Sequence, residues 1–375
     1  MMPPLGRFLL YFLRLGALGF GGPIALAGAM QRDLVEKHGW IAREDYLEGL
    51  ALAQMAPGPL AAQLAMYLGY VRGGVIGATV SGSAFVLPSL LMVWALAAAY
   101  VRFDGLRWMQ AVFYGIGAAV VGIIARSVLT LARLTLARDR LSWTIAVTLA
   151  VTTAVTAREN VALFVASGFV PLLIRRARSK PHQMEQASAL LLPVAAGAGL
   201  AAGGTSLPAL GWFFARAAIF VFGSGLAVIP FLYGGVVQER HWLNDRQFLD
   251  AVAVAMITPG PVVITVGFIG YLVRGTAGLF VAAAAIFLPV YLVVVIAAPW
   301  FRRYHRQPEV KAFVSGVTAA ATGAIAGAGM LLGARAIVDV WTAAIAAGTF
   351  VALWRWRISE LWLIGAAGGL GLCLR

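Results

Sequence analysis

Pro57-Gly58-Pro59 interrupts an apolar stretch of the sequence, and the same tripeptide recurs 202 residues later as Pro259-Gly260-Pro261. Proline removes a backbone donor, clashes with the preceding helical turn and drives the residue before it out of the helical region. Two prolines around a glycine therefore predict a broken helix rather than a bent one. In hydrocarbon the freed backbone groups must be satisfied by protein, water or ligand. Paired breaks in corresponding halves are typical of a transport site.

The composition predicts an all-α integral membrane protein, a polytopic helical bundle. Hydrophobic residues make up 61% and charged residues only 12% of the 375 residues, which is too apolar for a soluble domain of this length. Several apolar runs reach the length of about 20 residues that a membrane-spanning helix needs, and they lack the alternation of a membrane barrel. We therefore expect a multi-pass protein of the inner membrane.

The basic residues, which give a net charge of +14, lie in short loops beside apolar spans. This pattern indicates cytoplasmic loops and contact with anionic membrane lipid, and no nucleic-acid partner. Cys373 is the single cysteine, and the four histidines are not clustered. We therefore expect no disulfide, no metal site and no cofactor. The absence of a nucleophile-base constellation argues against an enzyme.

The chain contains an internal repeat. A shift of 202 superimposes residues 14–59 on 216–261 without a gap, and farther along a shift of 201 pairs Gly115 with Gly316. The predicted organisation is a first membrane repeat at 1–174, a basic cytoplasmic linker with a further apolar run at 175–207, and a second membrane repeat at 208–375.

The apolar runs predict six helical elements in each half. They lie near 8–30, 45–71 (broken), 74–101, 108–132, 141–157 and 159–174, and near 210–232, 246–273 (broken), 276–300, 309–334, 336–354 and 358–374. Loop Lys/Arg counts fit equally well if the broken elements cross the membrane or if they re-enter as hairpins. In both models the second half is upside down relative to the first. We therefore predict inverted-topology repeats.

Three arginines, Arg14, Arg126 and Arg216, fall inside apolar spans, and Arg14 and Arg216 are repeat mates. An arginine at the bilayer centre costs about 3 kcal/mol on insertion scales, so a buried one needs an anionic partner or a wet cavity. Snorkelling to the interface is the plainer alternative. Arg14 stands seven residues before Gly21, and Arg216 seven before Gly223, which puts each pair on one helix face about 10 Å apart.

Glycine-rich motifs follow these arginines: Phe20-Gly21-Gly22-Pro23 is echoed by Phe222-Gly223-Ser224-Gly225, without the proline. Such glycines let backbone amides approach a ligand or let helices pack closely. The half-helices that begin near Leu60 and Val262 direct amides and a positive dipole end toward the break. Together with forked arginine donors, they predict an anion pathway between inverted halves.

Other polar residues near the broken helices each have a structural role as well as a functional one to consider. Glu48 and Asp250 are predicted in the first helical turn, where an acidic side chain interacts favourably with the helix dipole. Proton coupling is the alternative role. Arg72 and Arg274 are expected to be interfacial anchors, with attraction of anions at a vestibule as the alternative. We expect four further side chains to satisfy backbone groups freed by the breaks: Gln54, Gln63, Thr258 and Thr265.

The paired motifs resemble the long two-domain form of the bacterial chromate transporter family. Phe-Gly-Gly-Pro and Ala-Pro-Gly-Pro in the first half, and Phe-Gly-Ser-Gly and Thr-Pro-Gly-Pro in the second, carry the resemblance over nearly the whole chain. It implies a secondary transporter that exports chromate through the inner membrane and confers resistance, with sulfate as a competing analogue. A carrier of sulfate or another oxyanion is the alternative, and a homodimer stays open.

The resemblance also implies the substrate-binding residues, which lie in corresponding positions of the two halves. They are Arg14, Gly21, Gly22, Pro23, Pro57, Gly58, Pro59, Arg216, Gly223, Ser224, Gly225, Pro259, Gly260 and Pro261.

Overall fold

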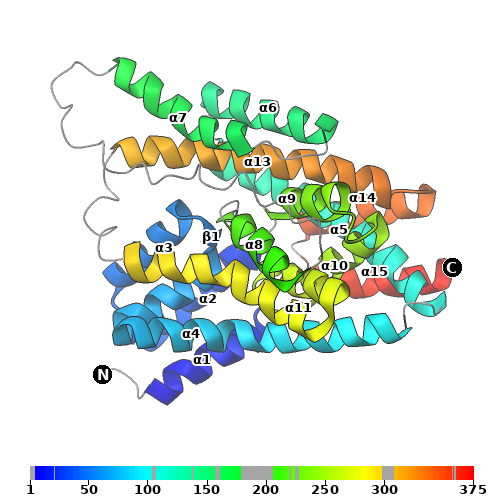
Figure 1. Cartoon of the computed structure of the whole chain (residues 1–375), viewed down its shortest axis with the longest axis horizontal. Helices are drawn as coiled ribbons and strands as arrows, with labels where there is room; N and C mark the ends of the chain where they lie inside the picture. Colours follow the sequence, from blue (N-terminus) through cyan, green and yellow to red (C-terminus); the bar gives the residue numbers. More distant parts are fainter. Residues whose placement is uncertain are drawn as a thin grey trace.

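The computed structural model is a helical bundle (Figure 1) and describes residues 5–20, 22–103, 107–136, 139–156, 161–178, 206–218, 221–223, 228–297, 308–356, 358 and 360–375. The first half comprises α1 (Leu5–Leu18), α2 (Gly22–Met30), η1 (Gln31–Lys37), α3 (Arg43–Met55), β1 (Gly58–Pro59), α4 (Leu60–Phe103), α5 (Arg107–Thr135), α6 (Arg140–Thr156) and α7 (Val161–Arg178). The second comprises α8 (Leu207–Ala217), β2 (Phe222–Gly223), α9 (Ile229–Tyr233), η5 (Gly234–Glu239), α10 (Asp245–Ile257), η6 (Val262–Ile264), α11 (Thr265–Leu292), η7 (Val293–Ala297), α13 (Pro308–Ala336), α14 (Val340–Arg355) and α15 (Glu360–Leu374).

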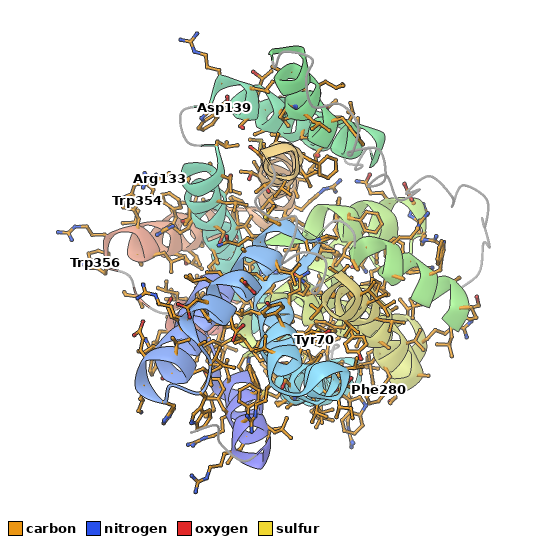
Figure 2. The ribbon with its side chains drawn as sticks, turned by 90° about the vertical axis from the view of Figure 1, so that its left-hand side faces the viewer. Tyr70, Arg133, Asp139, Phe280, Trp354 and Trp356 are labelled. Carbon is orange, nitrogen blue, oxygen red and sulfur yellow. The ribbon has the colours of Figure 1, made fainter. Side chains whose placement is uncertain are left out.

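The predicted all-α membrane bundle is confirmed. Within the part of the chain that the structure describes, four helical stretches are long and apolar enough to cross a membrane: Leu60–Phe103, Trp108–Arg133, Val262–Ile296 and Ala312–Ala336. Large apolar side chains such as Val155 and Trp362 are largely exposed on the outer surface, as expected for a lipid-facing wall. At one edge, Arg133 stacks over the ring of Trp354, with its guanidinium carbon 4.4 Å from the ring centroid (Figure 2). Tryptophan and arginine in this arrangement are typical of a membrane interface.

The first helix of each half is interrupted, which corrects the prediction of continuous helices at 8–30 and 210–232. α1 ends at Leu18 and α2 begins at Gly22, whose φ is 76°. Glycine tolerates this left-handed conformation, and Pro23 provides no backbone donor to continue the preceding helix. In the second half, α8 ends at Ala217 and α9 begins only at Ile229. We call these two interruptions the first and second breaks.

Each Pro-Gly-Pro joins two helical legs. α3 runs back along the start of α4, because a Cβ placed on Gly49 would lie 2.3 Å from the Tyr67 ring and Tyr67 Oη donates to Glu48 at 3.1 Å. Residues 43–72 therefore form a first hairpin whose tip is Pro57-Gly58-Pro59. In the second half, α10 and the start of α11 are joined in the same way and contact each other. α3 and α10 have 13 residues each, about 20 Å, which is short of a hydrocarbon core of about 30 Å.

A second reversal follows each hairpin, within α4 at Gly73-Gly74 and within α11 at Arg274-Gly275. Gly74 and Gly275 have φ values of 59° and 60°, a left-handed conformation that suits glycine. The legs on either side touch. A Cβ on Gly69, for example, would lie 2.3 Å from the carbonyl oxygen of Gly77. The sequence places the helix ends correctly here, at 71 and 273.

The last two helices of each half pack on a 29-residue helix of the other half, α5 or α13. α6 and α7 pack on α13, while α14 and α15 pack on α5 (Figure 1). The repeat mates Gly115 and Gly316 lie in corresponding contacts: added Cβ atoms would fall 1.9 Å from the Ala367 oxygen and 2.0 Å from the Ser167 oxygen. Small residues allow this close helix approach. Because the contacts are reciprocal, each half is covered by the last two helices of the other.

The linker predicted at 175–207 lies almost entirely outside the described residues, as does its apolar run.

Candidate functional site

Each Pro-Gly-Pro tip docks on the broken first helix of the opposite half. The Gly58 amide donates to the Val221 oxygen at 2.5 Å, and the Gly260 amide donates to the Gly19 oxygen at 2.9 Å. These two bonds are related by the 202-residue repeat, since it pairs Gly58 with Gly260 and Gly19 with Val221. We call these four residues and their immediate neighbours the junction. Here the backbone groups freed by one break satisfy those freed by another, as burial in a membrane requires.

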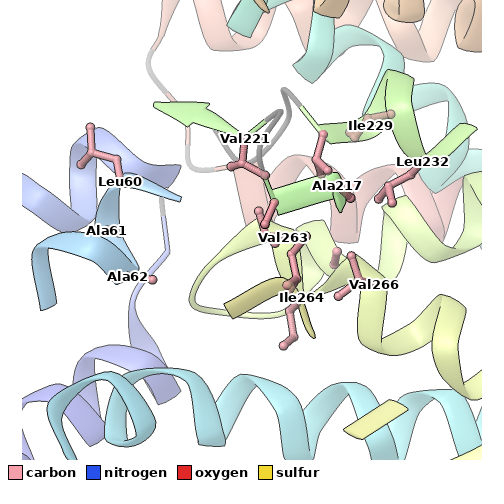
Figure 3. Close-up of a cluster of buried hydrophobic side chains, with 14 of the residues drawn as sticks. Leu60, Ala61, Ala62, Ala217, Val221, Ile229, Leu232, Val263, Ile264 and Val266 are labelled. Atoms are coloured by element: carbon pink, nitrogen blue, oxygen red, sulfur yellow. The ribbon is translucent and has the colours of Figure 1, made fainter. Parts of the chain in front are cut away.

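A short β-ladder adds to one arm of the junction. β1 and β2 pair in parallel, with Gly58 opposite Phe222 and Pro59 opposite Gly223. Buried apolar side chains surround this arm, including Leu60, Val221 and Val263 (Figure 3). Such a dry environment strengthens each backbone hydrogen bond. The junction is therefore a buried backbone contact between the two halves.

Glycine is required at both tips. The φ of Gly58 is 143° and that of Gly260 is 97°, which side-chain-bearing residues rarely adopt. A Cβ on Gly260 would lie 2.1 Å from Ser89 Oγ. Ser89 is itself buried and donates to the Gly16 oxygen at 3.2 Å. The second tip thus fits closely against α1 and α4 of the first half.

Of the four side chains expected to satisfy freed backbone groups, Gln63 bonds to a carbonyl of a tip, while Thr258 and Thr265 bond to carbonyls that already accept backbone amides. Gln63 Nε2 donates to the Pro57 oxygen at 2.8 Å. Thr258 Oγ1 donates to the Val254 oxygen and Thr265 Oγ1 to the Val262 oxygen, both at 2.7 Å. These three side chains are buried, whereas Gln54 is exposed. Gln63 therefore supports the broken backbone at the first tip, whereas the two threonines bond within their own helical turns.

A polar cavity of about 20 Å³ adjoins the other arm of the junction. Its walls come from the first break, the second tip and the start of α15, and include Gly19, Phe20, Gly22, Thr258, Gly260 and Glu360. This volume holds about one water molecule and is too small for a tetrahedral oxyanion. In this conformation the cavity does not admit such an anion.

Sequence reasoning missed Glu360 as a cavity residue. The available signal was its isolation, since no other acidic residue follows Asp339 and Glu360 opens the final apolar helix. Its place in the cavity could not be predicted, because it depends on α15 packing against α5 and α10.

The two predicted substrate arginines do not line this cavity. Arg14 is exposed on α1. Arg216 is half-buried on α8, and its Nε is buried without a hydrogen-bond partner among the described residues. Arg240, between η5 and α10, stacks over the Phe213 and Trp242 rings at 5.3 and 5.0 Å. Burial, together with the nearby Arg216 charge, lowers the pKa of Arg240. Arg216 and Arg240 therefore form a cationic pair away from the cavity.

Glu48 and Asp250 lie two residues and one residue deeper in their helices than predicted. The helices begin at Arg43 and Asp245, which moves both carboxylates beyond the free amides of the first turn. Asp250 is 4% exposed and accepts from Tyr100 Oη at 2.7 Å, while Glu48 accepts from Tyr67 Oη at 3.1 Å. The two acids connect α10 and α3 to α4.

The remaining predicted residues lie at turns or outside the described chain. Arg72 precedes the reversal within α4, and Arg274 is part of the reversal within α11. The Arg72 guanidinium lies 5.6 Å from the Phe8 ring centroid. Pro23 lies in the first turn of α2. Gly21, Ser224 and Gly225 are outside the described residues.

Both repeats of the chain match the same family of known proteins. The family model described as chromate transporter matches residues 6–172 and again residues 208–372. The chain belongs to the chromate transporter family. A chromate transport protein of Cupriavidus metallidurans is 56% identical over 98% of this chain and 92% of its own length. A probable chromate transport protein of Synechococcus elongatus is 54% identical over 92% and 88%, respectively. No solved structure matches.

The two family matches contain both breaks and both Pro-Gly-Pro tips. The junction of this chromate transporter family member is therefore made by two copies of the family unit that contact each other. Neither copy alone contains a docked tip.

Proposed function

We propose that this family member is a secondary transporter that exports chromate across the bacterial inner membrane and so confers chromate resistance. The observation that carries the proposal is the reciprocal docking of each Pro-Gly-Pro tip on the broken helix of the other half. The substrate follows from relatives that carry the name chromate transport protein and match nearly the whole chain.

In the proposed pathway the anion passes where the tips meet the breaks. The helices that start at Leu60 and Val262 direct backbone amides and positive dipole ends toward the tips, an arrangement that favours a tetrahedral oxyanion. Arg14 and Arg216, with Arg240 beside the latter, provide attraction at longer range. Opening requires the tips to separate from the breaks, since the cavity in the closed state is too small for the substrate.

The same geometry supports inverted, re-entrant halves. Each hairpin has a first leg of about 20 Å, so a hairpin that enters from one face places its tip near the middle of the membrane. Two tips that dock reciprocally near this depth fit hairpins entering from opposite faces. This is the arrangement in which a transporter alternates access around a central site.

The energetics do not require a coupling ion. The cell interior is negative, so each outward-moving negative charge gains about 2.3 kcal/mol per 100 mV. A chromate dianion gains twice that amount. Export against a concentration gradient can therefore be driven by the membrane potential alone.

Everted membrane vesicles test the proposal. Vesicles that contain the chain should accumulate chromate faster than vesicles from empty-vector cells, and intact cells should accumulate less chromate and tolerate more of it. Excess sulfate should slow chromate accumulation if the two anions share a site. Unchanged chromate accumulation, with the protein present in the membrane, would contradict the proposal. Sulfate transport without chromate transport would support the alternative substrate.

A further inference from the structure

Glu360 is the acidic residue in the wall of the junction cavity. The other described wall residues are uncharged and come from the first break, the end of α10 with the second tip, and Leu361 beside Glu360. Glu360 belongs to α15, which packs on α5 and α10 and therefore projects into a contact between the two halves. A carboxyl at this position faces the backbone that the substrate must pass.

Among the charged residues on the elements that pack against α15, one cation acts on Glu360. Arg126 of α5 is near enough to interact electrostatically with its carboxylate, and the buried Nε of Arg126 has no hydrogen-bond partner among the described residues. The other charged or titratable residues with described side chains on α5, α10 and α14 are Tyr114, Arg133, Asp245, Arg246, Asp250 and Arg355.

Several of these residues have other contacts. Arg133 lies over the Trp354 ring, Tyr114 donates to Asp339, and Asp250 accepts from Tyr100. Arg126 itself lies near the Trp354 ring, with its guanidinium carbon 6.0 Å from the ring centroid, and it is the neighbour whose charge acts on Glu360.

The two protonation states of Glu360 have opposite effects on an oxyanion in the cavity. A carboxylate repels an anion strongly in a partly desolvated site, and its negative charge offsets part of the positive charge of Arg126. A neutral carboxyl removes the repulsion, offers an O–H donor to the oxyanion and leaves Arg126 free to attract it. The proton is exchanged with water, and no bond other than this O–H forms or breaks.

We propose that Glu360 is the protonation-controlled gate of the anion pathway: its neutral form admits chromate to the junction and its ionised form excludes it. This inference rests on the proposed function. It assigns the proton-sensitive role to Glu360 rather than to Glu48 or Asp250, whose carboxylates are held by tyrosines of α4. Glu360 touches the pathway, whereas Arg126 acts through it as a positioning residue.

The test is chromate flux into proteoliposomes that contain the full chain, with the same pH on both sides and the membrane potential clamped. Chromate itself takes up a proton in the acidic range, so the readout is the flux of the wild type divided by that of Glu360→Gln at each pH. The glutamine keeps the size of the side chain and does not titrate. This ratio should approach one at low pH. It should fall with rising pH, by up to about tenfold per pH unit, because only the neutral fraction of Glu360 is competent.

Three further variants sharpen the result. Glu44→Gln, the same chemical change at an exposed position in the first turn of α3, should keep the wild-type profile. Glu360→Asp should retain a pH dependence that Glu360→Gln loses. Arg126→Gln should move the decline to higher pH, since removal of the positive charge keeps the carboxyl neutral over a wider range.

A flat ratio across the pH range, with both proteins folded and active, would overturn the gate. A wild-type chain that moves no chromate at any pH would instead overturn the proposed function. If Glu360→Gln does not fold, the absence of a shift in Arg126→Gln would overturn the gate independently.

Discussion

Gly260 shows how a single residue determines the closed junction. Its amide donates to Gly19 of the other half, its φ is 97°, and any Cβ would meet Ser89. The sequence predicts the need for glycine between the two prolines, because the tripeptide recurs in register. It does not reveal Gly19 as the partner, since that contact joins residues 241 positions apart.

Gly260→Ala should therefore destabilise the protein by about 1–3 kcal/mol through backbone strain, with a further cost from the clash with Ser89, and it should impair transport. Thermal unfolding in detergent and chromate flux measure the two effects. Gly28→Ala is the matched control, because a Cβ at Gly28 on α2 would meet nothing within 4 Å. Equal melting temperatures for the two variants would show that the tip is not closely packed.

Arg216 is the residue-scale test of long-range attraction. Arg216→Ala and Arg14→Ala should each abolish chromate transport while the protein still inserts into the membrane, because both remove a charge that draws the anion toward the pathway. Flux, together with the amount of protein in the membrane, distinguishes loss of function from loss of expression. Full transport in both variants and in the double variant would remove the two arginines from the site.

At the scale of elements, the two hairpins were largely predictable from the sequence. The first and second breaks, which interrupt the opening helix of each half, were not. Pro-Gly-Pro is a strong local signal. By contrast, glycines in residues 19–22 are equally compatible with close helix packing. The interruption at 19–22 is stabilised by a partner from the other half, so no local pattern decides it. The helix starts at Arg43 and Asp245 were predicted one to two residues late, which placed Glu48 and Asp250 in the wrong turn.

The bond between Tyr100 and Asp250 ties the second hairpin to α4. Tyr100→Phe should lower stability by about 1–3 kcal/mol, because it leaves a buried carboxylate without this donor. Tyr67→Phe should cost less, since its partner Glu48 is partly exposed. Tyr70→Phe, on the same helix, serves as a control in thermal unfolding. If all three variants unfold alike, the bond does not support the hairpin.

At the scale of the whole molecule, the repeat in the sequence predicts two similar halves and does not predict their exchange of helices. The predicted mates Gly115 and Gly316 do lie in corresponding contacts, but each contact is with the opposite half. The identity of the partner helix depends on long-range packing. Glu360 reaches the junction cavity for the same reason, because it is brought there by α15 packing on α5.

Gly115→Ala and Gly316→Ala should each destabilise the bundle, and by similar amounts, because each Cβ would fall within 2.0 Å of a backbone oxygen on the opposing helix. The resulting separation of helices should also lower transport. Gly117→Ala on the same helix as Gly115 should be tolerated, since nothing lies within 4 Å of its Cβ. Melting temperatures in detergent compare the three, and a tolerated Gly115→Ala would contradict the close approach.

The exchange of helices has a consequence for synthesis at the ribosome. α7 ends at residue 178, and its packing partner α13 begins only at residue 308. At about 5–20 residues per second, α6 and α7 are therefore made on the order of ten seconds before the surface that covers them. During that interval the Gly316-binding face of α7 has only lipid or the insertion machinery to contact. We therefore expect a first half made alone to be less stable in the membrane than the same half within the full chain.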